Sequence, residues 1–222
     1  MKTRSILVAA TFVALASQAA PVRSEVIGPL LPRQAIEMGF TARETDRILE
    51  YEGEESRFVQ RDIPFTLRYG ISTTTTLSLE LSGNLFNDDD DVSFYTVGAS
   101  VQLLVWRARG YTITMGLSYA RTLGIDEIDP KKQYDEQFLD WVLLGQREFL
   151  VHDQEFTLWL GPRVSYMSVK PQAPEVEIYN EAKNLLGGVV GAGFLLVDHI
   201  VLQGQLVYID EPEYRLNLAY RF

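Results

Sequence analysis

The chain of 222 residues contains no cysteine and only two histidines, His152 and His199. Without cysteine, the fold depends on no disulfide, on no thiolate-bound metal and on no lipid attached to an N-terminal cysteine. Both histidines fall in short predicted turns, and neither has a serine two positions away, so no nucleophile–base pair is recognisable. We therefore predict no catalytic residue, no metal site and no cofactor.

Basic charge is also scarce, with 20 Lys and Arg against 30 Asp and Glu, for a formal net charge of −10. This balance argues against nucleic acid as a partner and against a polybasic attachment to a membrane surface. Beyond the N-terminal residues the longest apolar run is Leu185–Val197, which is 13 residues long and contains four glycines. A spanning helix needs about 20 apolar residues, so no transmembrane helix is predicted.

The N-terminus has a separate pattern. Lys2 and Arg4 are followed by the apolar stretch Ile6–Ala16 and by small residues up to Ala19. This order is typical of a secretory signal peptide, which we assign to residues 1–19, with cleavage after Ser24 as the alternative. Residues 20–45, which are rich in proline, are predicted to be a periplasmic N-terminal segment, followed by a β-barrel over residues 46–222.

From Phe58 onward, apolar and polar residues alternate with a period of two, which is the pattern of β-strands with two different faces. Several of these stretches run 12–15 residues, longer than the roughly 5–6 residues usual in soluble sheets and enough to cross a membrane at a tilt. The turns between them are alternately short and mostly longer, as in outer-membrane barrels. The expected strands are Val59–Ile71, Thr75–Phe86, Val92–Trp106, Tyr111–Leu123, Glu136–Leu150, Glu155–Val169, Asn184–Val197, Ile200–Ile209 and Tyr214–Phe222.

The last nine residues have the clearest alternation. One face carries Tyr214, Leu216, Leu218, Tyr220 and Phe222, and the chain stops at this last aromatic residue. The pattern resembles the C-terminal assembly signal of Gram-negative outer-membrane β-barrel proteins. The resemblance implies recognition by the barrel assembly machinery, export by the secretory pathway and a place in the outer membrane among its lipids and lipopolysaccharide. The oligomeric state stays open.

The fold class that follows is all-β, a transmembrane antiparallel up-and-down barrel. Nine strands are visible from Phe58, and bacterial barrels of one chain use even numbers. We therefore predict ten strands, with the additional one at Asp46–Glu52. Eight or twelve strands are the alternatives, because the capping-box pattern Thr41–Glu44 favours a helix over Ala42–Glu52 instead.

The polar faces of the strands carry charges that a small barrel must compensate, because an unpaired buried charge costs several kcal/mol. These residues form either an ion-pair network that fills the lumen or the constriction of a narrow pore. The predicted lumen charges are Arg68, Glu80, Glu155, Arg163, Arg215 and Arg221. Three glycines, Gly187, Gly191 and Gly193, face inward. Because they have no side chains, we expect side chains from other strands to pack against the backbone there.

The function predicted from these features is an envelope structural or interaction role for an outer-membrane barrel with a largely side-chain-filled lumen. The alternative is a narrow channel or transporter for small solutes, and a lipid-modifying enzyme is a third reading. The hairpin formed by Leu67–Ile71 and Leu77–Leu81 resembles one found in outer-membrane transporters associated with the degradation of aromatic compounds. It favours a barrel more than any substrate.

The direction of the closing strand determines the expected orientation of the barrel in the membrane. If it runs toward the periplasm, four loops face outward, namely Asn87–Asp91, Gly124–Asp135, Lys170–Lys183 and Asp210–Glu213. These loops contain most of the acidic surplus. Their carboxylates would approach lipid phosphates, so divalent cations are expected as bridges between them.

Overall fold

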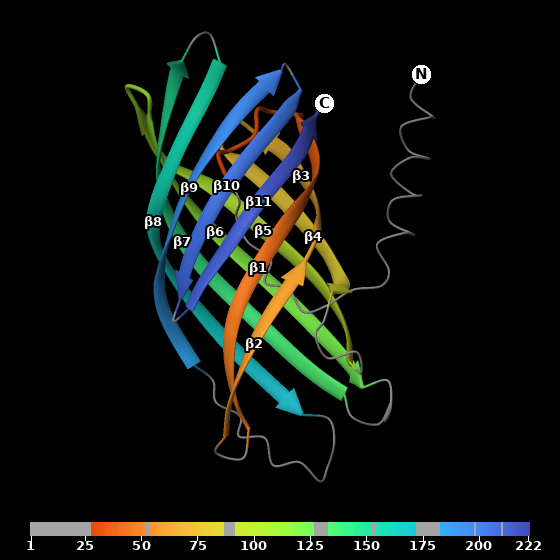
Figure 1. Cartoon of the computed structure of the whole chain (residues 1–222). Helices are drawn as coiled ribbons and strands as arrows, with labels where there is room; N and C mark the ends of the chain where they lie inside the picture. Colours follow the sequence, from red (N-terminus) through yellow and green to blue (C-terminus); the bar gives the residue numbers. More distant parts are fainter. Residues whose placement is uncertain are drawn as a thin grey trace.

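The structure is a computed structural model, and its strands close into one antiparallel barrel (Figure 1). It describes residues 28–51, 54–86, 92–126, 133–151, 154–171, 183–197, 199–209 and 211–222. The strands are β1 (Ile36–Tyr51), β2 (Glu54–Asp62), β3 (Phe65–Ser72), β4 (Thr75–Phe86), β5 (Val92–Ala108), β6 (Tyr111–Asp126), β7 (Gln133–Val151), β8 (Gln154–Pro171), β9 (Lys183–Val197), β10 (Ile200–Ile209) and β11 (Glu211–Arg221).

The barrel has ten positions although eleven strands are named, because β2 and β3 share one position. β3 pairs with the first half of β1, at Ile36–Phe40, and β2 pairs with the second half, at Arg43–Tyr51. The chain between them passes through Ile63 and Pro64, and proline has no N–H with which to continue the ladder. The barrel closes where β1 pairs with β11. The predicted ten-stranded barrel is confirmed.

The first strand begins ten residues earlier than predicted, at Ile36 instead of Asp46. Thr41–Glu44 therefore lies in β1, and the helix suggested by the capping-box pattern is wrong. The reason is the long-range pairing of β1 with β11, which extends from Glu37–Arg221 to Thr45–Glu213. That ladder satisfies the backbone groups that a helix would have paired locally. The part of the chain that the structure describes contains no helix.

The two faces of the closing strand are arranged as predicted. Its five apolar residues point outward, with exposed fractions from 44% at Tyr220 to 62% at Phe222. Arg215, Asn217 and Ala219 point into the barrel and are buried. The outer wall is thus apolar and the inner wall mainly polar. No helix in the described part of the chain is long and apolar enough to cross a membrane.

Exposed aromatic residues of this outer face gather near both ends of the strands. Tyr69, Tyr111, Tyr220 and Phe222 belong to the end with the short turns, and Tyr119, Tyr166, Tyr208 and Tyr214 belong to the other. Phe149, Phe156 and Tyr95 are half-buried. Phe156 packs against both Phe149 and Phe194, with ring centroids 6.1 and 4.5 Å apart.

β7 is the strand with apolar residues on both faces, and the structure gives the reason. Its inward Leu144 packs with Trp159, Val189 and Val207 in an apolar cluster inside the lumen. Trp159 lies against Gly191, where an added Cβ would overlap the indole ring. This confirms that the glycines of β9 provide room for a side chain from a neighbouring strand. An apolar cluster therefore lies on the β7–β10 side of the lumen, beside buried polar residues of the same strands.

Of the four loops predicted to face outward, Asn87–Asp91 lies outside the described residues, as do half of Gly124–Asp135 and most of Lys170–Lys183. The fourth is shorter than predicted, because β11 begins at Glu211. Glu213 is consequently not a loop residue. Its side chain is buried in the lumen, since it follows the same two-residue period as Arg215.

Candidate functional site

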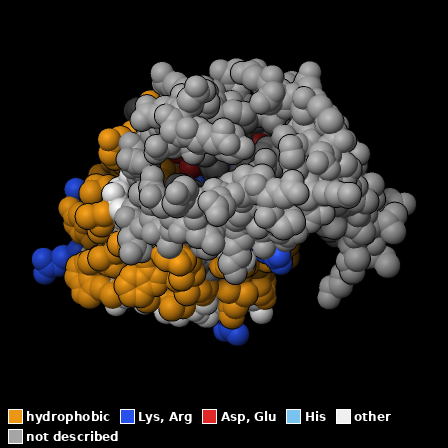
Figure 2. Space-filling view, turned by 90° about the horizontal axis from the view of Figure 1, so that it is seen from below, with side chains coloured by type: hydrophobic (Ala, Val, Ile, Leu, Met, Phe, Trp, Pro, Cys, Tyr) orange, Lys and Arg blue, Asp and Glu red, His pale blue; other side chains and the backbone are white. Residues whose placement is uncertain are grey.

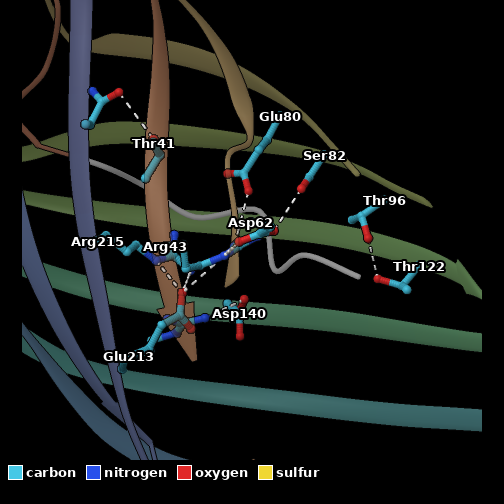
Figure 3. Close-up of polar contacts among 12 residues, drawn as sticks. Thr41, Arg43, Asp62, Glu80, Ser82, Thr96, Thr122, Asp140, Glu213 and Arg215 are labelled. Carbon is cyan, nitrogen blue, oxygen red and sulfur yellow. Dashed lines mark hydrogen bonds and ion pairs between the residues drawn. The ribbon is translucent and has the colours of Figure 1, made fainter. Parts of the chain in front are cut away.

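The largest group of luminal charges gathers around Arg43 of β1 (Figure 3). Its guanidinium binds both carboxylate oxygens of Asp62, with Nε–Oδ1 at 2.9 Å and Nη2–Oδ2 at 2.5 Å. Nη1 lies 3.4 Å from Oε1 of Glu80, and Nε lies 3.8 Å from Oε1 of Glu213. One arginine thus joins carboxylates from β2, β4 and β11, which are neighbouring strands on the same side of the barrel as β1.

Two further contacts complete this group, which we call the central network (Arg43, Asp62, Glu80, Glu213 and Arg215). Arg215 Nη2 lies 2.5 Å from Oε1 of Glu213, and the Ser82 hydroxyl donates to Asp62 at 2.8 Å. All five charged residues are at most 5% exposed. Buried charges persist only when paired and hydrogen-bonded, so this network stabilises one arrangement of β1, β2, β4 and β11.

A second charge chain lies at the short-turn end, where the barrel closes. Glu37 of β1 accepts from Arg68 of β3 at 2.8 Å and from Arg221 of β11 at 3.0 Å. Arg68 is buried, whereas the Arg221 side chain is 20% exposed. Because Glu37 binds the strands on both sides of β1, it connects β11 to β1 and β3.

A third pair connects β7 and β8. Arg163 Nη2 lies 2.8 Å from Oδ2 of Asp140, and the Ser165 hydroxyl also contacts that carboxylate. Arg163 was predicted as a lumen charge and is buried there. Glu155 was predicted as well, but it is exposed at the start of β8. Glu155 is separated from the inward residues of β8 by an even number of positions, as an inward residue should be. It lies at the end of the strand, however, where the barrel wall no longer encloses it.

Residues Gly28–Pro32 also lie inside the barrel, at the short-turn end. Leu31 is 1% exposed, and its N–H donates to the Thr76 hydroxyl at 2.9 Å. The Pro29 carbonyl accepts from Arg68 at 2.6 Å. This part of the predicted periplasmic segment is therefore luminal, because its backbone finds polar partners on the inner wall. We call residues Gly28–Ala35 the luminal segment.

These features occupy three parts of the lumen. The central network occupies its middle, the luminal segment its short-turn end and the Trp159 cluster its β7–β10 side. Seen from the opposite end, acidic side chains are visible inside the barrel (Figure 2). The arrangement can hold charged groups in fixed positions and obstruct passage.

The histidines and the possible metal ligands remain to be located. His199 is exposed in a short turn, where Nδ1 lies 2.9 Å from the Arg221 carbonyl oxygen and the ring stacks on Tyr220. His152 lies outside the described residues. Among the residues that the structure describes, no three His, Cys, Asp or Glu side chains are placed to hold a metal ion.

Several luminal charges were missed by sequence reasoning. Glu37 and Arg43 alternate with Met38, Phe40 and Ala42, so the period of two was already present upstream of Asp46. Asp62 was placed on a polar face but not among the lumen charges. Asp140 was obscured by the apolar residues on both faces of β7, and Glu213 was assigned to a loop.

The sequence matches no family model and no curated protein. The fold is similar to solved outer-membrane barrels. The translocator domain of the autotransporter NalP from Neisseria meningitidis matches with a TM-score of 0.53 and 11% identity, over 86% of this chain and 90% of that one. The COG4313 outer membrane channel from Pseudomonas putida F1 matches with a TM-score of 0.53 and 14% identity, over 90% of this chain and 99% of that one.

The outer membrane protease OmpT from Escherichia coli also matches, with a TM-score of 0.44 and 9% identity, over 88% of this chain and 99% of that one. That likeness is too distant to say anything about catalysis in this chain. The comparisons thus agree on the outer-membrane barrel fold.

Proposed function

We propose that this chain is an integral protein of the Gram-negative outer membrane with a closed lumen, acting as a structural or interaction protein of the envelope. The observation that carries the proposal is the central network, whose five buried charges join the neighbouring strands β11, β1, β2 and β4 on the inner wall of the barrel. A barrel of about eight strands is only just wide enough for its side chains to fill, and ten positions add little space. The apolar outer wall fits the hydrocarbon of a bilayer.

Conductance in planar lipid bilayers tests this proposal. The full-length mature protein should insert without producing a steady single-channel current, because the central network and the luminal segment obstruct the lumen. A steady current from every inserted molecule would contradict the closed barrel. Heat-dependent migration on a gel would verify that each preparation is folded before recording.

A narrow channel for small solutes is the second candidate, and one observation favours it. Gly28–Leu31 are bound by wall side chains from several strands, whereas a wall strand would be bound by continuous ladders on both sides. The luminal segment pairs with the wall backbone at Gln34 and Ala35, which bond to Gly70 of β3. Departure of Gly28–Leu31 would therefore leave the ladders of the barrel intact. The Pseudomonas putida neighbour is described as a channel, although at 14% identity it supports the fold alone. Brief openings in the bilayer recordings would favour this candidate.

A further inference from the structure

The luminal segment is held by side chains from several separate strands. Gln102 of β5 and Gln146 of β7 both direct their Nε2 atoms to the Gly28 carbonyl oxygen, at 3.2 and 3.5 Å. Arg68 of β3 donates to the next carbonyl, that of Pro29, and Thr76 of β4 accepts from the Leu31 N–H. The backbone of this segment is thus bound by side chains of β3, β4, β5 and β7. We call Arg68, Thr76, Gln102, Gln146 and Gln203 the peptide cradle.

The fit between the segment and the wall is close on both sides. Gly28 has φ of +70°, which a residue with a side chain rarely adopts, and an added Cβ would overlap the Gln203 amide. On the wall, an added Cβ at Gly70 would overlap the Pro32 carbonyl oxygen. Leu31 fills the interior with an exposed fraction of 1%. The cradle therefore selects a small first residue and an apolar fourth residue.

The cradle also has hydrogen-bonding capacity that the described residues do not use. Gln203 Nε2, Gln102 Oε1 and Arg68 Nε are buried and have no partner within the described ranges. Each of the three residues is 2% exposed. Buried polar groups usually bind a partner, so these atoms indicate a site built for a polar, peptide-like guest.

We infer that the lumen contains a binding site for an extended peptide, occupied in this structure by the protein's own residues Gly28–Leu31. The donors of the cradle recognise backbone carbonyl oxygens, which every peptide offers, and the burial of Leu31 excludes a charged side chain at the fourth position. A peptide of matching sequence supplied from another molecule can take the same place once the luminal segment has left. This inference goes beyond the closed barrel, because it assigns the lumen a ligand.

The test is a competition, in the full-length protein, between the luminal segment and an added peptide for the cradle. In the variant Leu31→Asp, a carboxylate would have to enter a buried apolar position, so the luminal segment should leave the cradle. A fluorescent hexapeptide with the sequence of residues 28–33 should then bind to the detergent-solubilised variant, measured by fluorescence anisotropy. Its affinity should be at least tenfold higher than for the unchanged protein, in which the cradle is already occupied.

Two controls show whether binding occurs in the cradle. The same peptide with Asp in place of its leucine at position 31 should not bind. Adding Gln102→Ala to the Leu31→Asp protein should weaken peptide binding about threefold to tenfold, the effect expected from losing one hydrogen bond. Equal binding to the unchanged protein and to Leu31→Asp, or equal binding of the two peptides, would overturn the inference.

The variant Gly28→Val is the second route to an empty cradle if Leu31→Asp does not fold. A β-branched residue is strained at φ of +70° and would overlap Gln203, whereas the wall strands keep their sequence. Absence of peptide binding to a folded variant of either kind would also refute the site. Because the readout is binding and not current, its outcome is independent of whether the unchanged protein conducts.

Discussion

At the scale of single residues, Arg43 organises the lumen. It contacts Asp62, Glu80 and Glu213 while its side chain is only 3% exposed. Removing it would leave buried carboxylates without their shared cation. Such a loss is far more costly than the loss of a surface ion pair, because the remaining charges stay out of water.

We therefore expect Arg43→Met to lower the free energy of unfolding by about 3–5 kcal/mol. Urea-induced unfolding in lipid vesicles, followed by tryptophan fluorescence, measures it. Arg147→Met is the matched control, because Arg147 is exposed and contributes through its position over the Tyr111 and Phe149 rings, at 4.8 and 4.7 Å. Its loss should cost at most about 1 kcal/mol. Similar stabilities for the two variants would contradict a structural role for the central network.

At the scale of elements, the barrel is completed by the seam between β1 and β11. The backbone N–H of Phe222 donates to the Ile36 carbonyl at 2.8 Å, and Tyr220 packs on Phe222 with ring centroids 4.7 Å apart. The terminal residue therefore belongs to the seam, and its ring is 62% exposed on the outer wall. This is the position that the C-terminal pattern assigns to the assembly signal.

Replacing Phe222 by Asp should reduce the amount of folded protein in the outer membrane, because a charge would replace the aromatic ring on the lipid-facing side of the closing strand. Membrane fractionation and heat-dependent gel migration measure the result. Phe222→Tyr, which keeps the ring, should assemble normally. Unchanged yield and migration for Phe222→Asp would argue against an assembly signal at this end.

At the scale of the whole molecule, the two ends of the barrel differ. At one end of the barrel, which we call the short-turn end, β3, β5, β7 and β9 end beside the luminal segment and His199, and β4, β6, β8 and β10 end at the other (Figure 1). We predict that the short-turn end faces the periplasm. The absence of cysteine from the sequence makes this orientation easy to test.

A cysteine introduced at Pro174, which lies outside the described residues, should react with a membrane-impermeant thiol reagent on intact cells. A cysteine at His199 should react only after the outer membrane has been permeabilised, and the cysteine-free parent provides the background. The reverse labelling would overturn the orientation. It would also place His199 at the cell surface and reopen the question of catalysis there.

The sequence by itself determined the features that depend on local alternation. A period of two places Leu77 and Leu79 outside and Ser78 and Glu80 inside, whatever the partner strands are. The same rule predicted the faces of the closing strand and the burial of Arg68, Arg163 and Arg215. Strand number followed from a general preference for even barrels, which the structure confirms.

Only the tertiary structure decided which residues meet across the lumen. Arg43 and Glu213 are 170 positions apart in the chain, and they come together because β1 pairs with β11 at closure. The same pairing overrode the helix signal at Thr41–Glu44, since a ladder along the whole strand satisfies more backbone groups than one capped turn. The place of Gly28–Leu31 inside the barrel was likewise hidden, because an irregular segment has no periodicity and its partners come from several separate strands.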